Sequence, residues 1–225
     1  MTIGEIVAND FRAAAIFKEA GIDFCCGGKK SIDDTCNEKI INKADLMEKL
    51  KRLESTPNKT SHNFKEWDPA FLCDYIVNTH HSYVVKTLPD LRTYAAKVAQ
   101  VHGDHHPELV EVADLFVKIN AELLQHLKNE EEVLFPAIKE VVNTGSVKAK
   151  ATIVSEIARM TGEHEFAGGA MDEINKITKG YKVPEDGCNT YRVAFKLLEQ
   201  FEDDLHTHVH LENNILYPKA LELAN

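Results

Sequence analysis

The sequence predicts an all-α protein in which a small helical domain precedes an up-down four-helix bundle. From Trp67 onward, apolar residues recur at steps of three and four, which marks one face of a helix, and none of this region alternates as a strand does. Glycine-containing breaks divide the region into four segments. A chain of 225 residues suits one such bundle with a small extra domain.

Residues 1–56 are the expected small domain. Asn9 or Asp10 can cap a helix that runs to Ala20, and Gly21 is a suitable stop. Small polar residues also mark where two further helices begin. These expected caps are Ser31, with Asp34 three residues later as in a capping box, and Asn42, whose helix is expected to end near Leu53.

A polar stretch, residues 55–65, contains Pro57 and is expected to be a linker. Residues 66–225 then form the bundle. Its breaks contain Gly103, Gly145 and the segment 180–187. The four expected helices cover about 68–102, 107–142, 146–179 and 188–222. Pro89 lies inside the first, and the apolar stripe that continues past it predicts a kink instead of a break.

Polar residues interrupt all four apolar stripes. Two interruptions have the form His-x-x-x-Glu, and residues four apart stack on one helix face. The candidate ligands are His81 in the first stripe, His126 and Glu130 in the second, His164 in the third, and His208 and Glu212 in the fourth. Counted from the turns, they fall at similar depths in an up-down bundle, within about one helical turn, or ~5 Å.

A single histidine in an apolar stripe is more often a hydrogen-bonded core residue than a ligand. Four histidines and two glutamates at one level are better explained by metal binding, because a buried carboxylate without a partner is costly. Six ligands suit two ions bridged by the glutamates, as in other bundles with paired metals. Nitrogen and oxygen donors without thiolate accept iron, manganese or zinc.

Several other histidines are left out of this set. His80 points about 100° away from His81 on a helix. His206 and His210 lie off the core line, so surface or supporting positions are expected for both. Three more histidines are expected to cluster in solvent at the turn between the first two helices, where a weak second metal site is an alternative: His102, His105 and His106.

Charge and composition exclude several classes of function. The formal charge is −10 with no basic run, which gives no electrostatic case for nucleic acid or an anionic membrane. No apolar segment approaches the ~20 residues of a membrane span, and the N-terminus has no secretory pattern. The cysteines are odd in number, five in all, and two are adjacent, which favours a reducing cytoplasm over a disulfide framework.

Longer motifs carry a resemblance to a known family. Residues 21–28 read Gly-Ile-Asp-Phe-Cys-Cys-Gly-Gly, and 126–136 and 208–218 read His-Leu-Lys-Asn-Glu-Glu-Glu-Val-Leu-Phe-Pro and His-Val-His-Leu-Glu-Asn-Asn-Ile-Leu-Tyr-Pro. The chain resembles, over nearly its whole length, the iron–sulfur cluster repair di-iron proteins, also called the repair of iron centres family, which have a haemerythrin-like bundle.

The resemblance implies a function that spacing alone does not give. Such proteins restore iron–sulfur clusters damaged by nitric oxide or oxidants, and donation of iron from an oxo- and carboxylate-bridged di-iron site is the proposed chemistry. It implies a cytoplasmic homodimer whose partners are damaged iron–sulfur proteins. The family's ligands fall on the six residues of the stripes, its vicinal cysteines on Cys25 and Cys26, and its iron-path glutamates on Glu122 and Glu163.

Cys25 and Cys26 are expected to lie on an exposed loop between glycines, with a redox or metal-transfer role. Lys29 and Lys30 could lower their pKa values. The other three cysteines are expected to be packing residues: Cys36, Cys73 and Cys188. Glu122 and Glu163 could equally be ordinary solvent-facing charges.

Two other functions use the same centre. The protein could be a redox enzyme that reduces nitric oxide or peroxide, or a sensor that binds oxygen or nitric oxide without turnover. The adjacent cysteines favour repair over sensing, because a sensor has no evident need for them.

Overall fold

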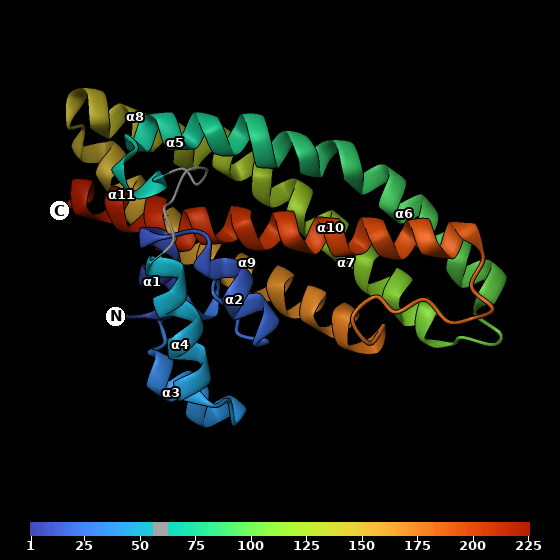
Figure 1. Cartoon of the computed structure of the whole chain (residues 1–225). Helices are drawn as coiled ribbons and strands as arrows, with labels where there is room; N and C mark the ends of the chain where they lie inside the picture. The colour runs from blue at the N-terminus through green and yellow to red at the C-terminus, as the bar shows by residue number, and fades with distance from the viewer. Residues whose placement is uncertain (56–62) are drawn as a thin grey trace.

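The computed structural model describes residues 1–55 and 63–225 and is all-α, as predicted. Among these residues the only β pairing is an isolated antiparallel bridge between Thr2 and Ser31. Figure 1 shows a long bundle with a smaller helical unit against one side, near the C-terminal end of the chain. Residues 56–62, the middle of the predicted linker and the end of the predicted first domain, lie outside the described residues.

Four long antiparallel columns make the bundle (Figure 1). The first is α5 (Pro69–Ile76), η3 (Val77–His81) and α6 (Ser82–His102); the second is α7 (Glu108–Asn129), η4 (Glu130–Leu134) and α8 (Phe135–Thr144); the third is α9 (Val147–Ile177); the fourth is α10 (Asn189–Leu211), η5 (Glu212–Leu216) and α11 (Tyr217–Ala224). These columns match the four predicted segments within a few residues, because their apolar stripes face one common core.

The columns end where the sequence predicts. Gly145 adopts a left-handed φ of 68° after α8, and Gly180 one of 72° after α9, a conformation that favours glycine. The first column runs on through Pro89 without a break. Among the described helices, none is both long and apolar enough to cross a membrane.

Three columns contain a π-helical turn, η3, η4 and η5. Phe135-Pro136 and Tyr217-Pro218 follow η4 and η5 directly. Proline has no N–H to donate to the carbonyl four residues back, so the α-helical pattern cannot continue unchanged through these points. The wider turn just before each proline accommodates the lost hydrogen bond, and such turns occur often at functional sites.

The N-terminal unit contains α1 (Ile3–Asn9), α2 (Ala13–Glu19), η1 (Gly27–Lys29), α3 (Ile32–Lys39) and α4 (Lys43–Glu54). The predicted helix that ends at Ala20 is α2, with Gly21 in a left-handed conformation after it, but α2 begins at Ala13, later than a cap at Asn9 or Asp10 would give. Thr2 and Glu5 form a capping box that starts α1 earlier, and the Asp10 carboxylate binds Arg12 between the two short helices. Ser31 and Asn42 cap α3 and α4 as predicted.

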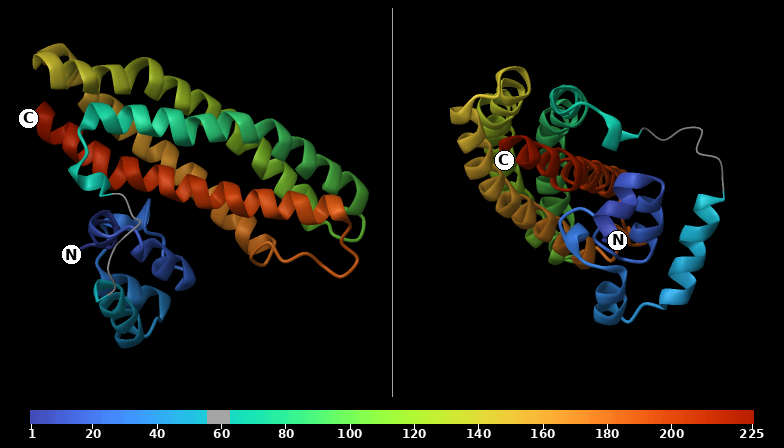
Figure 2. Two further views of the ribbon diagram at one scale, coloured as in Figure 1. Left: turned by 45° about the horizontal axis from the view of Figure 1, so that its top comes forward. Right: turned by 90° about the vertical axis from the view of Figure 1, so that its left-hand side faces the viewer.

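The small unit shares a hydrophobic core with the bundle. Ile3, Val7 and Phe17 belong to the same buried cluster as Leu198 and Phe201 of α10. The end-on view in Figure 2 shows the unit lying beside the bundle, with its helices outside the four columns. The loop between α2 and η1, which carries the adjacent cysteines, is therefore held against the bundle.

Candidate metal centre

Six polar residues from all four columns meet inside the bundle. Each is at most 2% exposed. Three of them belong to π-turns: His81 ends η3, Glu130 begins η4 and Glu212 begins η5. The complete group is His81, His126, Glu130, His164, His208 and Glu212, which is the set that the apolar stripes selected.

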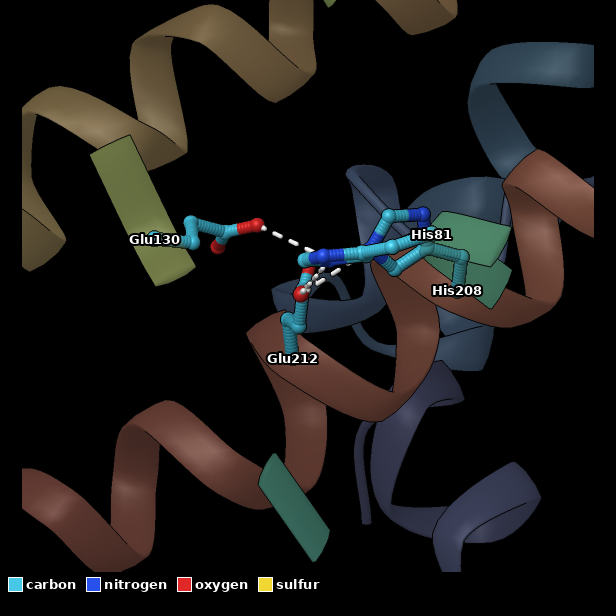
Figure 3. A group of neighbouring side chains, drawn as sticks. All are labelled: His81, Glu130, His208 and Glu212. Atoms are coloured by element: carbon cyan, nitrogen blue, oxygen red, sulfur yellow. Dashed lines mark hydrogen bonds and ion pairs between the residues drawn. The ribbon is translucent and has the colours of Figure 1, made fainter. Parts of the chain in front are cut away.

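One half of the group contains His81, His208 and both glutamates (Figure 3). The Nε2 atom of His81 lies 3.3 Å from Glu130 Oε2 and 3.9 Å from Glu212 Oε1. The Nε2 atom of His208 lies 3.0 Å from Glu212 Oε1. Figure 3 shows the imidazoles and carboxylates converging from separate columns on one point.

The other half contains His126 and His164 with the same two glutamates. Nε2 of His126 lies 3.3 Å from Glu130 Oε2, and Nε2 of His164 lies 3.1 Å from Glu212 Oε2. The two Nε2 atoms are themselves 3.0 Å apart. In each half, the four ligand atoms lie within 4.8 Å of one another. Because both glutamates belong to both halves, the geometry provides two adjacent four-donor pockets with shared carboxylates.

Several inward-facing atoms of the group have no hydrogen-bond partner. They are His81 Nε2, Glu130 Oε2 and Glu212 Oε2, all buried. Buried polar atoms in proteins nearly always have partners, so orphaned acceptors and ring nitrogens that are aimed at one point fit a bound cation. Imidazole and carboxylate donors at this spacing fit two metal ions.

The opposite ring nitrogens are held by outer partners. The Nδ1 atoms lie 2.8 Å from Glu131 for His81, 2.7 Å from Glu163 for His126, and 2.9 Å from Asn213 for His164. Such contacts fix ring orientation and leave Nε2 free to face a metal.

Tyr217 contacts the group through both its hydroxyl and its ring. Its hydroxyl donates a 2.6 Å hydrogen bond to Glu130 Oε1, and its ring stacks on His164 at 5.8 Å. Three of these outer residues were not predicted from the sequence: Tyr217, Asn213 and Glu131. The only available signal was their position just beside or one turn after a ligand.

The charges of the group are strongly coupled. For His81, burial opposes protonation, but the Glu130 and Glu212 carboxylates outweigh it and raise its pKa to about 10. For Glu130, burial and Glu212 oppose ionisation, but His126 and His81 outweigh them and lower its pKa to about 2. The ionised forms of Glu130 and Glu212 are therefore stabilised by positive charge nearby, which protons on the histidines or metal ions can supply.

His80 and His210 are both buried, at 4% and 0% exposed. The surface position expected by default for His210 is therefore wrong: its ring packs between Phe11 and Phe24 of the small unit. His80 points away from the ligand cluster as expected, and its Nδ1 lies 2.9 Å from Asp204. Its ring also stacks on His208 at 5.6 Å, so it backs a candidate ligand.

A small pocket leads from the surface toward the group. Glu122, Glu163, His126, His164 and His208 line it, and its volume of about 10 Å³ is room for one water molecule. Glu122 is exposed, whereas Glu163 is half-buried and bound to His126 and Arg159. The structure therefore brings both glutamates to one pocket, Glu163 in contact with a candidate ligand and Glu122 without such a contact.

The adjacent cysteines do not lie on an exposed loop, contrary to expectation. Cys25 is 3% exposed, and contact with Cys26 together with burial raises its pKa well above the usual value. Lys30 pairs with Glu38 instead of a thiol. Cys26 is half-buried, and its Sγ lies 3.5 Å from the backbone oxygen of His164.

Asn214, two residues after Glu212 in η5, ties this loop to the metal group. Asn214 Nδ2 donates to the Cys25 carbonyl at 3.0 Å. A Cβ atom at Gly4 or Gly28 would lie 2.1 or 2.5 Å from Asn214 Oδ1, so only glycine permits this close packing. Three successive residues of η5 thus have different partners. Glu212 faces the metal group, Asn213 faces His164, and Asn214 faces the cysteine loop.

Cys36 and Cys73 are buried as expected, but Cys188 is exposed. Its thiol lies 3.2 Å from His102 Nε2, and this contact lowers its pKa to about 7. His106 binds Asp186 at 3.1 Å, and His105 is exposed. In the described part of the chain, no three metal-ligating side chains converge at this end of the bundle.

Comparisons with known proteins agree with this arrangement. The model of the hemerythrin HHE cation binding domain matches residues 74–220, and ScdA_N, a domain of unknown function, matches residues 1–54. The chain is 32% identical to the iron-sulfur cluster repair protein ScdA of Staphylococcus epidermidis over 219 residues, covering 97% of this chain and 96% of that protein.

Two further relatives have similar coverage. The iron-sulfur cluster repair protein YtfE of Pectobacterium atrosepticum is 34% identical over 223 residues, covering 98% of this chain and 96% of the relative. A probable iron-sulfur cluster repair protein of Haemophilus influenzae is 35% identical over 222 residues, with 97% and 96% covered. The chain therefore belongs to the hemerythrin HHE cation binding family and, by its full-length relatives, to the family of the ScdA and YtfE proteins.

Proposed function

We propose that this protein repairs iron–sulfur clusters damaged by nitrosative or oxidative stress, by donating iron. The relatives named as iron-sulfur cluster repair proteins are similar over nearly the whole chain, including the segment with the adjacent cysteines. The observation that carries the proposal is the pair of buried four-donor pockets that share Glu130 and Glu212.

In this proposal two non-haem iron ions occupy the pockets. His81 and His208 would hold one ion, His126 and His164 would hold the other, and Glu130 and Glu212 would serve both. The donor set supports this assignment, because imidazole and carboxylate ligands suit iron. With six protein ligands for two ions, coordination positions remain open, which favours release of iron over permanent storage.

Glu163, Glu122 and the adjacent cysteines are proposed to serve the path of departing iron. Glu163 contacts the candidate ligand His126 and lines the same pocket as the exposed Glu122. Cys26 contacts the backbone of His164. These contacts support a route on which oxygen and sulfur donors lie close to the centre.

We further propose that the chain consists of a 1–56 unit and a 66–225 unit, and that it acts in the cytoplasm as a homodimer on damaged iron–sulfur proteins. The separate matches to residues 1–54 and 74–220 support the division. The five cysteines are all free thiols, which supports a reducing compartment.

Transfer of labelled iron tests the proposal. The protein is loaded with ⁵⁷Fe and mixed with a [4Fe–4S] protein that nitric oxide has inactivated. Recovery of the recipient's activity is expected, with ⁵⁷Fe in its cluster by Mössbauer spectroscopy. Glu130→Gln should abolish transfer, and exposed Glu132→Gln should not. An inactive recipient with all label still on the donor contradicts repair.

A second candidate is reduction of nitric oxide or peroxide at the same centre. The water-sized pocket lined by three of the candidate ligands favours it, because it admits only very small molecules. Steady consumption of nitric oxide with an electron donor and no net loss of iron would support this function. Loss of iron in step with recovery of the recipient would support repair.

A further inference from the structure

A second cluster of potential ligands lies outside the buried metal centre. It consists of Asp172 on α9 and Glu202 and His206 on α10. Their ligand atoms lie within 4.8 Å of one another. His206 lies two residues before His208, so its side chain points about 200° away from that ligand around the helix. The cluster therefore faces a different side of α10.

The cluster opens into a cavity of about 400 Å³ where the N-terminal unit meets the bundle. Ile22, Asp23 and Phe24 of the small unit line this cavity together with the three cluster residues. The ring of His206 packs edge-on against Phe24 at 6.0 Å. The cluster therefore borders a space that solvent can reach, with the His206 ring packed on the small unit.

Glu202 is the buried member of the cluster, at 2% exposed. Asn175 donates to both of its oxygens, at 3.2 and 3.0 Å. Burial and the nearby Glu202 carboxylate raise the pKa of the Tyr181 hydroxyl, which faces the same carboxylate. Burial raises the pKa values of Glu202 and Asp172, with His206 the largest opposing influence on each, so neither charge is fully compensated.

Lysines near the cavity do not neutralise the cluster directly. Lys18 pairs with Asp203, and Lys176 lies 3.1 Å from Glu173. Both lysines line the cavity, but each has its closest carboxylate outside the cluster. Lys39 also lines the cavity and lowers the pKa of Asp172, after His206. A cation at the cluster would be stabilised by its two carboxylates at short range.

We propose that Asp172, Glu202 and His206 bind one divalent first-row metal ion, separate from the buried pair. Two carboxylates and one imidazole suit Fe²⁺, Mn²⁺ or Zn²⁺, and the cavity leaves room for water at the remaining positions. The ion would stabilise the ionised form of the buried Glu202 carboxylate.

Titration with Mn²⁺ tests the site. The full chain, with its buried centre already filled with iron, is titrated, and free Mn²⁺ is followed by electron paramagnetic resonance. The wild-type protein is expected to bind one Mn²⁺ per chain. Asp172→Asn and His206→Ala should each weaken this binding at least about tenfold, since each removes a ligand. Glu199→Gln, on the same helix but outside the cavity, is the matched control and should bind as the wild type does.

The design separates this site from the buried centre. Circular dichroism and iron content should be the same in all variants, because Asp172 is exposed and none of the changes touches the six buried donors. Equal Mn²⁺ binding by the wild type, Asp172→Asn and His206→Ala would overturn the site, and so would an absence of binding to the wild type. Loss of Mn²⁺ binding only when Glu130 or Glu212 is replaced would assign the ion to the buried centre and also overturn the site.

Discussion

Each histidine of the buried group carries two ring nitrogens with different tasks. Nε2 faces the shared glutamates, and in His81, His126 and His164 the Nδ1 atom binds an outer acceptor. This division fixes the tautomer that a metal requires. His208 differs, because its Nδ1 is buried without a partner and its ring instead stacks against His80. Packing therefore replaces hydrogen bonding as the means of orienting this ring.

Removal of the Tyr217 hydroxyl tests how far outer contacts control the metal. Tyr217→Phe keeps the ring that stacks on His164 but loses the hydrogen bond to Glu130, so iron should still bind. Loss of such an outer contact typically weakens metal binding about 10–100-fold, and release of iron to a chelator should quicken accordingly. Tyr75→Phe, in the aromatic cluster around Trp67, is the control. Equal release rates in the two variants would show that this hydrogen bond does not matter.

The cysteines should differ in reactivity with pH. The His102 contact lowers the pKa of Cys188 to about 7, so its thiolate forms as the pH rises through that value. Its alkylation by iodoacetamide should rise around pH 7, whereas Cys25, with its raised pKa, should remain unreactive there.

His102→Ala removes the contact that favours the Cys188 thiolate. The midpoint of Cys188 alkylation should then move upward by about one pH unit, toward the ordinary thiol range. His105→Ala changes a nearby exposed histidine and should leave the midpoint in place. Mass spectrometry of the alkylated peptides measures each site separately, and an unchanged midpoint in His102→Ala would contradict the assigned cause.

At the scale of elements, the π-turns decide which side chains reach the centre. Each ligating π-turn places a donor at its first or last position, and η4 and η5 are followed by proline. In η5 the wide turn directs Glu212, Asn213 and Asn214 to three different partners. Successive residues of a regular α-helix point about 100° apart. The wider turn changes this angle, so the local helix pitch, together with burial, determines which partner each side chain contacts.

Replacement of Asn214 tests this coupling between elements. Asn214→Ala removes the hydrogen bond to the Cys25 carbonyl without touching a candidate ligand, so iron content should stay the same. Hydrogen exchange in residues 24–28 should become faster, because the loop loses a fixed contact. Asn78→Ala, in the π-turn η3, removes a hydrogen bond to the Asp74 carbonyl of the preceding α5 and should leave that exchange unchanged. Unaltered exchange in both variants would rule out the proposed coupling through Asn214.

At the scale of the molecule, the buried centre and the packing of the small unit occupy one region. The cysteine loop packs on α9 and η5, where a Cβ atom at Gly168 would lie 3.2 Å from Cys26 Sγ. The metal group lies directly beneath, since Cys26 also contacts the His164 carbonyl. Changes at the centre and changes at the interface between the two parts are therefore expected to influence each other.

Removal of the metal should lower the stability of the whole fold. A ligand present at 100 times its dissociation constant stabilises the native state by about 2.7 kcal/mol, which for a chain of this size is about 5–10 °C in melting temperature. Differential scanning calorimetry should therefore show a lower melting temperature after chelation and recovery when Fe²⁺ is restored. A melting temperature that is unaffected by chelation would argue against metal at this centre.

The amino-acid sequence predicted the helices and most of the candidate ligands from local helix geometry. Helical periodicity located the four columns, small polar residues located the α3 and α4 caps, and i to i+4 spacing selected His126 with Glu130 and His208 with Glu212. These signals need only the pitch of a helix and the cost of burying charge. The start of α1 was not predicted, although Thr2 and Glu5 have the spacing of a capping box in the sequence itself.

Contacts between distant segments were decided only by the tertiary structure. The burial of Cys25, the position of His210 between Phe11 and Phe24, and the pairing of His102 with Cys188 all join residues far apart in sequence. Side-chain identity and local spacing do not specify which surface covers a loop, since that depends on how the small unit packs on α9 and α10. The sequence by itself therefore determined the helices and their inward-facing donors, whereas packing between the two parts decided which remaining polar groups are buried, paired or open to a cavity.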